Sequence, residues 1–212
     1  MSSFNSSTFG TISGHFGNAV AATMRDGRSI LKIFRPPFNP KSAKQVAQRS
    51  KFAFVILFLA CMRAIFAITF KNRGGYNHGF KLAFRDAVTG IAPNYVIDYS
   101  KLVFTEGKTV NKSNQVSIEK TIGTTVKVIW AMTNVSANTS FGANPTDDVS
   151  LVFYNPESQE AMLIEGCAKR VKATFDAVLP DVWAGSEIHS WIYFSKAGTG
   201  NSNSEYVGIA QL

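Results

Sequence analysis

The chain has 212 residues, 45% of them hydrophobic, and a formal net charge of +8. This length and apolar content allow one large domain or two small ones to bury a core without disulfide staples. Only Cys61 and Cys167 are present, far apart and outside any Cys/His cluster, which argues against a disulfide framework and a zinc site.

The positive charge is concentrated in the first part of the chain. Residues 1–93 contain thirteen Lys and Arg against two Asp, or 13 − 2 = +11, whereas residues 94–212 contain nine against twelve acidic residues, or 9 − 12 = −3. This asymmetry indicates an anionic partner for the first part: nucleic acid, a membrane surface or an acidic protein. The alternative is that neighbouring copies neutralise one another head to tail.

The N-terminal segment predicts a β-hairpin after a polar arm. Residues 1–8 are Ser-rich, so we expect an arm that orders on a partner. Asp26-Gly27 then separates two β-capable runs, and this pair favours a tight turn. A hairpin alone is marginal in water and must pack on something else. The N-terminus lacks the pattern of a secretory signal, so cytoplasmic synthesis is the expectation.

A long helix is predicted from Pro40 to about Phe70. Asn39 can cap its first turn, and proline suits the first helical position. Near its start, basic residues recur at helical spacing, which places them on one solvated face. They are expected either to contact nucleic acid or an acidic partner or to form an ordinary solvated surface. Together with one arginine beyond the helix, the candidates are Lys41, Lys44, Arg49, Lys51 and Arg73.

The second half of this helix, residues 52–70, has Arg63 as its single charged residue. Its length is just enough to cross a bilayer. Two features argue against spanning. Placing Arg63 near the middle of the bilayer would cost about 2.5–3.5 kcal/mol on insertion scales, and basic residues on both flanks leave the helix without a preferred orientation. We therefore predict a helix buried nearly all round, which requires an oligomer or a larger assembly. The residues assigned to this assembly helix are Phe52, Phe54, Phe58 and Phe66.

The remaining chain predicts a short helix and then a β-sandwich. A Gly-rich break at 72–79 leads to a helix over 80–89 that Gly90 ends. Eight candidate strands follow Pro93, over 96–104, 114–120, 124–132, 147–155, 160–166, 169–179, 188–196 and 205–211. Their number and spacing are typical of an immunoglobulin-like or fibronectin-like antiparallel sandwich. The expected fold is thus α+β, with a basic hairpin and helical region over 1–93 and a sandwich over 94–212.

No set of residues predicts catalysis or a cofactor. His15, His78 and His189 lie outside any catalytic motif and are expected to be surface or structural residues. Asp147 and Asp148 form a carboxylate pair that a calcium ion could use, but a solvated turn is the simpler interpretation. We therefore expect no enzyme, no cofactor and no metal.

Five stretches spread over nearly the whole chain stand out: GTISGHFGNAV, NPKSAKQVAQRSKF, TGIAPNYVIDYSKLVFTEG, DDVSLVFYNPES and SNSEYVG. Together they resemble an uncharacterised protein family common in Bacteroidota and in genetic elements of phage type. The piece formed by Asn39, Pro40, Gln45, Arg49, Lys51 and Phe52 is similar to a helix opening in short phage-associated structural proteins.

The sequence therefore favours a non-enzymatic structural or assembly subunit of a larger particle, and a phage or phage-derived virion is the expected particle. It would form a homo-oligomer or bind other subunits, and the virion is then its expected location. A sequence-independent nucleic-acid-binding protein that uses the basic region is the first alternative. A membrane-associated adaptor is the second alternative.

Overall fold

The computed structural model describes residues 2–4, 13–35, 39, 41–108, 110, 112–113, 115–131, 142–198 and 200–212. The chain forms two compact units, Met1–Ser42 and Ala43–Leu212. The fold is α+β and all paired sheet strands are antiparallel. The division expected after Pro93 falls inside the second unit, because the helices there share a core with the strands that follow.

The first unit is a four-stranded sheet with the order β1-β4-β3-β2. The predicted hairpin is confirmed: β3 pairs with β4, and at the turn the Gly27 N–H donates to the Met24 carbonyl at 3.0 Å. Gly27 has a φ of 82°, a left-handed conformation that glycine adopts without strain. The expected loose arm is not seen at 2–4, which pairs with β4; residues 5–8 lie outside the described part. The strands are β1 Ser2–Phe4, β2 Gly14–Phe16, β3 Ala19–Thr23 and β4 Ser29–Ile33.

The second unit opens with α1 (Ala43–Leu59) and α2 (Arg63–Thr69), two helices with an 82° bend between them. The prediction of one continuous helix over 40–70 is therefore wrong. Leu59 at the end of α1 and Phe66 in α2 belong to one buried cluster, and the bend lets both helices face it. No single helix in the described ranges is long and apolar enough to cross a membrane, although the bent pair passes that test by length and composition.

The second predicted helix is present with different ends. It runs through α3 (Tyr76–Leu82) and the π-helical η2 (Ala83–Ala87), and the 3-10 turn η1 (Lys71–Arg73) precedes it. Gly90 does not end the helix but lies in a hairpin of β5 (Val88–Ile91) and β6 (Asn94–Ile97). A Cβ at Gly90 would meet the Asn94 carbonyl oxygen at 2.3 Å, so glycine allows the two strands to approach closely.

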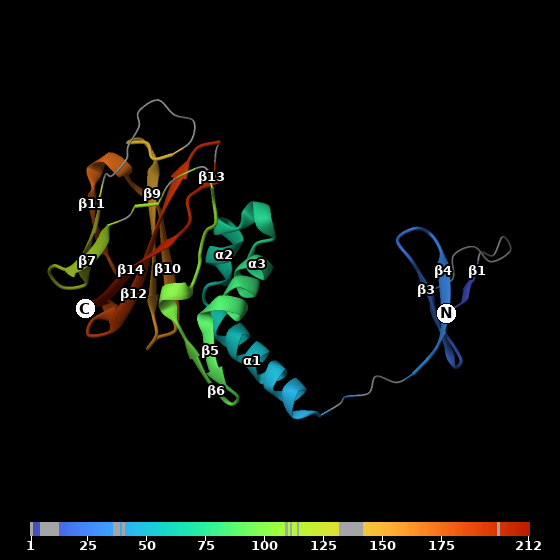
Figure 1. The fold of residues 1–212 in the computed structure, drawn as a ribbon. Coiled ribbons are helices and arrows are strands. Elements are labelled where there is room, and N and C mark those ends of the chain that lie inside the picture. Colours follow the sequence, from blue (N-terminus) through green and yellow to red (C-terminus); the bar gives the residue numbers. More distant parts are fainter. Residues whose placement is uncertain are drawn as a thin grey trace. The chain divides into compact units, whose positions relative to one another are not determined.

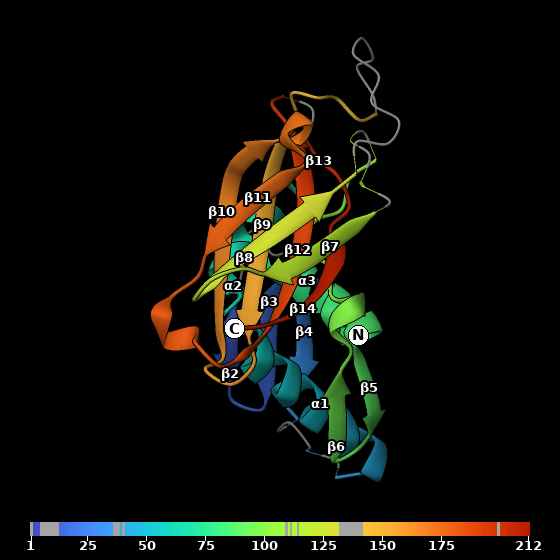
Figure 2. The ribbon, with the colours of Figure 1, turned by 90° about the vertical axis from the view of Figure 1, so that its left-hand side faces the viewer.

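The rest of the second unit contains two antiparallel sheets, which we call the two-sheet stack (Figures 1 and 2). The large sheet has the order β10-β9-β12-β13, with β14 also paired to β12, and the small sheet has the order β11-β8-β7. Seven candidate strands are confirmed, but 96–104 instead holds the end of β6 and the turn η3 (Tyr99–Lys101). The elements are β7 Val116–Lys120, β8 Thr125–Trp130, β9 Asp148–Asn155, β10 Glu160–Lys169, η4 Arg170–Lys172, β11 Thr174–Val178, η5 Asp181–Trp183, β12 Glu187–Lys196, β13 Gly200–Asn201 and β14 Glu205–Gln211.

The large sheet lies between the helices on one side and the small sheet on the other (Figure 1). Because side chains alternate along a strand, β9 and β12 supply both cores. Val152 and Trp191 pack with the helices, whereas Leu151 and Ile192 pack with the small sheet. This two-sided burial explains why these strands read as nearly continuous hydrophobic runs.

Candidate functional site

The basic residues singled out in the sequence do not converge on one site. Lys44 and Arg49 are exposed on α1 and Lys41 precedes that helix. The Lys51 ammonium instead lies 4.5 Å from the centre of the Phe84 ring, and Arg73 in η1 lies 3.4 Å from the Glu106 carboxylate. Two of the five side chains are thus already engaged by groups of their own chain.

The four phenylalanines assigned to an assembly helix also divide. Phe66 is fully buried and stacks on Phe104 with ring centres 5.3 Å apart. Phe54 and Phe58 are half-buried in the same cluster. Phe52 is partly exposed, with its ring edge against Phe80. The chain therefore buries most of these four phenylalanines in its own core. The sequence had instead predicted that partner molecules would cover them.

A different side of α1 is apolar and exposed. Its residues share one helical face, because they recur at spacings of three and four along the chain. Leu57 is 74% exposed and Ile56 is 42% exposed. Arg49 precedes them on that face, one helical turn before Phe52 and Ala53. We call Phe52, Ala53, Ile56 and Leu57, together with Ala60 just after the helix, the apolar face of α1.

Sequence reasoning missed Ile56 and Leu57 because residues 52–60 are apolar all round. The buried side of α1 carries Val55 and Leu59, and the exposed side carries residues of equal hydrophobicity. A pattern of 3.6 residues per turn appears only where polar residues interrupt the run. The small side chains of Ala53 and Ala60 were the one local difference between the two sides.

The second unit also contains a cleft of about 620 Å³. Its walls are the end of α2 with η1, residues 106–108, and the ends of β9, β10 and β12. Cations from Lys71, Arg73 and Lys108 face carboxylates from Glu106, Asp148 and Glu165. Such mixed charge favours recognition of a polar group over attraction of a strongly charged one.

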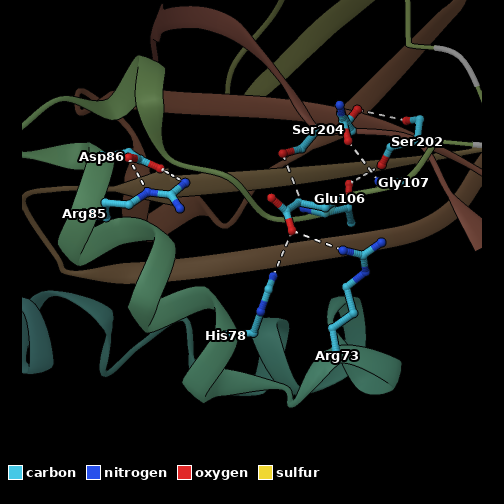
Figure 3. A network of polar contacts seen from close by, with 10 residues as sticks. Arg73, His78, Arg85, Asp86, Glu106, Gly107, Ser202 and Ser204 are labelled. Carbon is cyan, nitrogen blue, oxygen red and sulfur yellow. Dashed lines mark hydrogen bonds and ion pairs between the residues drawn. The ribbon is translucent and has the colours of Figure 1, made fainter.

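The wall formed by residues 104–107 is held by polar contacts on two sides (Figure 3). On the helical side, the Glu106 carboxylate lies 2.8 Å from His78 Nε2 and 3.4 Å from Arg73 Nη1. On the sheet side, the Phe104 N–H donates to Ser204 Oγ at 2.9 Å and Thr105 Oγ1 donates to the Ser202 carbonyl at 2.7 Å. Arg85 and Asp86, also drawn in Figure 3, form a separate exposed pair.

The deeper lining of the cleft is engaged in structural contacts. Burial raises the pKa of the Tyr193 phenol to about 12, so its hydroxyl stays neutral at physiological pH. Ser150 Oγ accepts a hydrogen bond from the Gly166 N–H at 3.1 Å. This arrangement offers polar groups that can bind a polar ligand.

The carboxylate pair that could have bound calcium is occupied by cations. The Asp147 carboxylate lies 3.3 Å from the Arg170 guanidinium, and both side chains are fully buried. Asp148 pairs with Lys169 at 2.6 Å. Within the part of the chain that the structure describes, no group of three His, Cys, Asp or Glu is placed to hold a metal ion.

The histidines lie in three separate surroundings. His15 is exposed in β2, and His78 contacts Glu106. His189 is buried, with Nδ1 2.8 Å from the Tyr206 hydroxyl and its ring stacked on Tyr99 at 3.8 Å. Burial lowers the pKa of His189 and the nearby Glu187 opposes that shift. These contacts give His189 a packing role in the core.

Comparison with known proteins shows which family the chain belongs to. None of the curated proteins compared with the chain matches it. The model of one family of unknown function, DUF6266, matches residues 11–208, which include both compact units except for their outermost residues. The chain therefore belongs to the DUF6266 family, a family of unknown function.

Proposed function

We propose that this protein is a non-enzymatic structural or assembly subunit of a larger particle. The observation that carries the proposal is the apolar face of α1. Exposed apolar residues that share one face mark interaction surfaces, because water contact with them is unfavourable. On this helix Leu57 keeps 74% of its surface exposed and Ile56 keeps 42%.

The first unit supports the same conclusion. Among the side chains described in 13–35, Ala21 and Ser29 alone are buried. Four short strands need an apolar core or a covering partner for stability. The exposed apolar side chains that such a partner would cover are Met24, Leu31, Ile33 and Phe34.

We also infer that the two-sheet stack is an immunoglobulin-like sandwich. With β7 to β12 and β14 taken as strands A to G, the sheets are A-B-E and D-C-F-G. The constant-type immunoglobulin arrangement is A-B-E-D against C-F-G, so the two differ in the sheet that the fourth strand joins. Domains of this architecture are used widely as binding and assembly modules.

A phage-type virion is the particle that the sequence resemblance favours, and other copies of this chain are the simplest neighbours. Sequence-independent nucleic-acid binding is the second candidate function. It is favoured by residues 27–85, which contain no Asp or Glu and twelve Lys and Arg, because such a stretch can neutralise phosphates.

The test is a pair of lysine substitutions followed by mass measurement with light scattering. Leu57→Lys places a charge on the apolar face of α1 and is expected to reduce the mass of the wild-type assembly. Val171→Lys changes an exposed valine of η4 and should leave that mass unchanged. Thermal melts check that both variants fold.

Two outcomes would contradict the proposal. One is a wild-type protein that stays monomeric at every concentration, and the other is a Leu57→Lys variant that assembles as the wild type does. Nuclease treatment forms a further arm. Loss of the large species on nuclease digestion would favour the nucleic-acid function instead.

A further inference from the structure

We propose that the apolar face of α1 docks on the acidic end of the two-sheet stack of a second copy, so that copies join head to tail. This inference rests on the proposed assembly function and names its partner. The acidic end consists of the exposed carboxylates of Glu157, Glu160 and Asp181 and the exposed apolar side chains of Ile122, Val178 and Val182.

Contacts within the chain gather these residues at one end. Thr124, in the turn that carries Ile122, donates from Oγ1 to Asp181 at 3.3 Å. Trp183, next to Val182, donates from Nε1 to the Glu160 carboxylate at 2.7 Å. Ser186 Oγ likewise donates to Glu157 at 2.9 Å. Three loops, from β7–β8, β9–β10 and η5, therefore form a single surface.

The apolar residues of this end are unusually exposed. Ile122 is 88% exposed and Val182 is 80% exposed. Val178, at the end of β11, adds a third exposed aliphatic side chain. The surface thus offers both aliphatic groups for burial and carboxylates around them.

The two surfaces are complementary in charge. Helices α1 and α2, over 43–69, contain four Lys and Arg and no Asp or Glu. The segments that build the acidic end, 121–124, 156–160 and 178–187, contain four carboxylates and no Lys or Arg, and Lys120 borders the first of them. Opposite charges around an apolar contact favour this pairing and guide its orientation. A symmetric pairing of two α1 faces would instead place cations against cations.

The position of the two surfaces makes the contact self-propagating. Helix α1 lies on one side of the large sheet, whereas β7 and β11 of the small sheet lie on the other (Figure 1). One copy can therefore use both surfaces at once, with a different neighbour at each. A heterologous contact of this kind produces a ring or an open filament, according to whether the rotation closes.

The decisive experiment mixes two variants that each lack one surface. Leu57→Lys removes the apolar face of α1, and Val182→Lys removes the acidic end. Each alone should be a folded monomer by light scattering, whereas the wild type forms species larger than a dimer. Their equimolar mixture should give a discrete dimer and nothing larger, because one intact surface of each kind remains.

Val171→Lys serves as the matched control, because it also places a lysine at an exposed valine of the two-sheet stack. It should assemble as the wild type does. Arg49→Glu should weaken assembly most at low salt, where charge pairing is least screened.

The alternatives give different results. If Val182→Lys assembles as the wild type does while Leu57→Lys does not, the acidic end is not the partner, although the assembly function stands. If the wild type is monomeric but sediments with phosphatidylserine vesicles in a Leu57-dependent way, the face binds lipid and this inference fails. A wild type that stays monomeric at every concentration overturns the assembly function as well, whether or not it binds vesicles.

Discussion

The guanidinium of Arg170 and the carboxylate of Asp147 lie 3.3 Å apart, with neither side chain exposed to solvent. Arg170 also lies 4.0 Å from the centre of the Phe194 ring and donates from Nη2 to the Lys112 carbonyl at 3.2 Å. Asp147 accepts from the Asn144 N–H at 2.8 Å. The pair thus joins the loop before β9 to η4, through charges that water cannot reach.

Asp147→Ala should destabilise the second unit strongly. It removes the Asp147 carboxylate from the buried Arg170 cation, which lowers the free energy of unfolding by about 3–5 kcal/mol. The neighbouring pair Asp148–Lys169 is solvent-exposed, so Lys169→Met should change the free energy of unfolding by about 0–1 kcal/mol. Urea unfolding of both variants measures the contrast. Equal losses would show that burial does not decide the strength of these pairs.

His189 should make the protein less stable in weak acid. Burial holds its pKa below the ordinary value of 6.5, so below that pH the unfolded chain takes up the proton more readily than the folded chain. The contribution of neutral His189 to stability is present in full above pH 6.5, and it is lost as the pH falls through the lower pKa that the residue has in the folded chain. His189→Gln should flatten this part of a stability–pH curve measured by urea unfolding.

Gly107→Ala should loosen the wall of the cleft. An added Cβ would stand 1.5 Å from the backbone oxygen of Asn201, so the two segments must separate. The Gly107 N–H bond to Asn203 Oδ1, at 2.9 Å, would be lost. We expect a loss of about 1–3 kcal/mol and faster amide exchange over 104–107 and 202–204. Lys108→Ala, at the next and exposed position, should leave exchange there unchanged.

Phe66→Ala should reduce stability because it opens a cavity in the core. The ring is fully buried between Phe70 and Phe104, and such a deletion lowers the free energy of unfolding by about 3–5 kcal/mol. Phe52→Ala, on the partly exposed side of α1, should lower it much less. Denaturant unfolding separates the two. A larger loss for Phe52 would contradict the division of α1 into a core face and an exposed face.

Much of the local structure could be predicted from the sequence. Alternation at Val126, Val128 and Trp130 indicated β8, and Asp26-Gly27 indicated the turn between β3 and β4. These features depend on neighbours in the sequence, where periodicity and turn chemistry act. The two-sided burial of β9 and β12 was not foreseen, because a continuous apolar run does not say what covers each face.

The candidate surfaces depend on contacts between distant residues. His78 and Glu106 are 28 positions apart, and no local pattern connects them. The bend at 60–62 occurs inside an apolar run without glycine or proline, and Leu59 and Phe66 on its two sides pack into one core with the large sheet. Charge asymmetry predicted an anionic partner for residues 1–93 or head-to-tail neutralisation between copies, but the placement of Asp181 beside Thr124 required the fold.

The double cover of the large sheet has a consequence for the history of the family. A substitution in β9 or β12 must fit the packing of the two cores at once. These strands can therefore diverge in sequence only when the residues that pack on both of their sides change with them. The small sheet faces solvent on its outer side, and its outward positions can vary singly. Among relatives, β9 and β12 should therefore be the slowest strands to diverge.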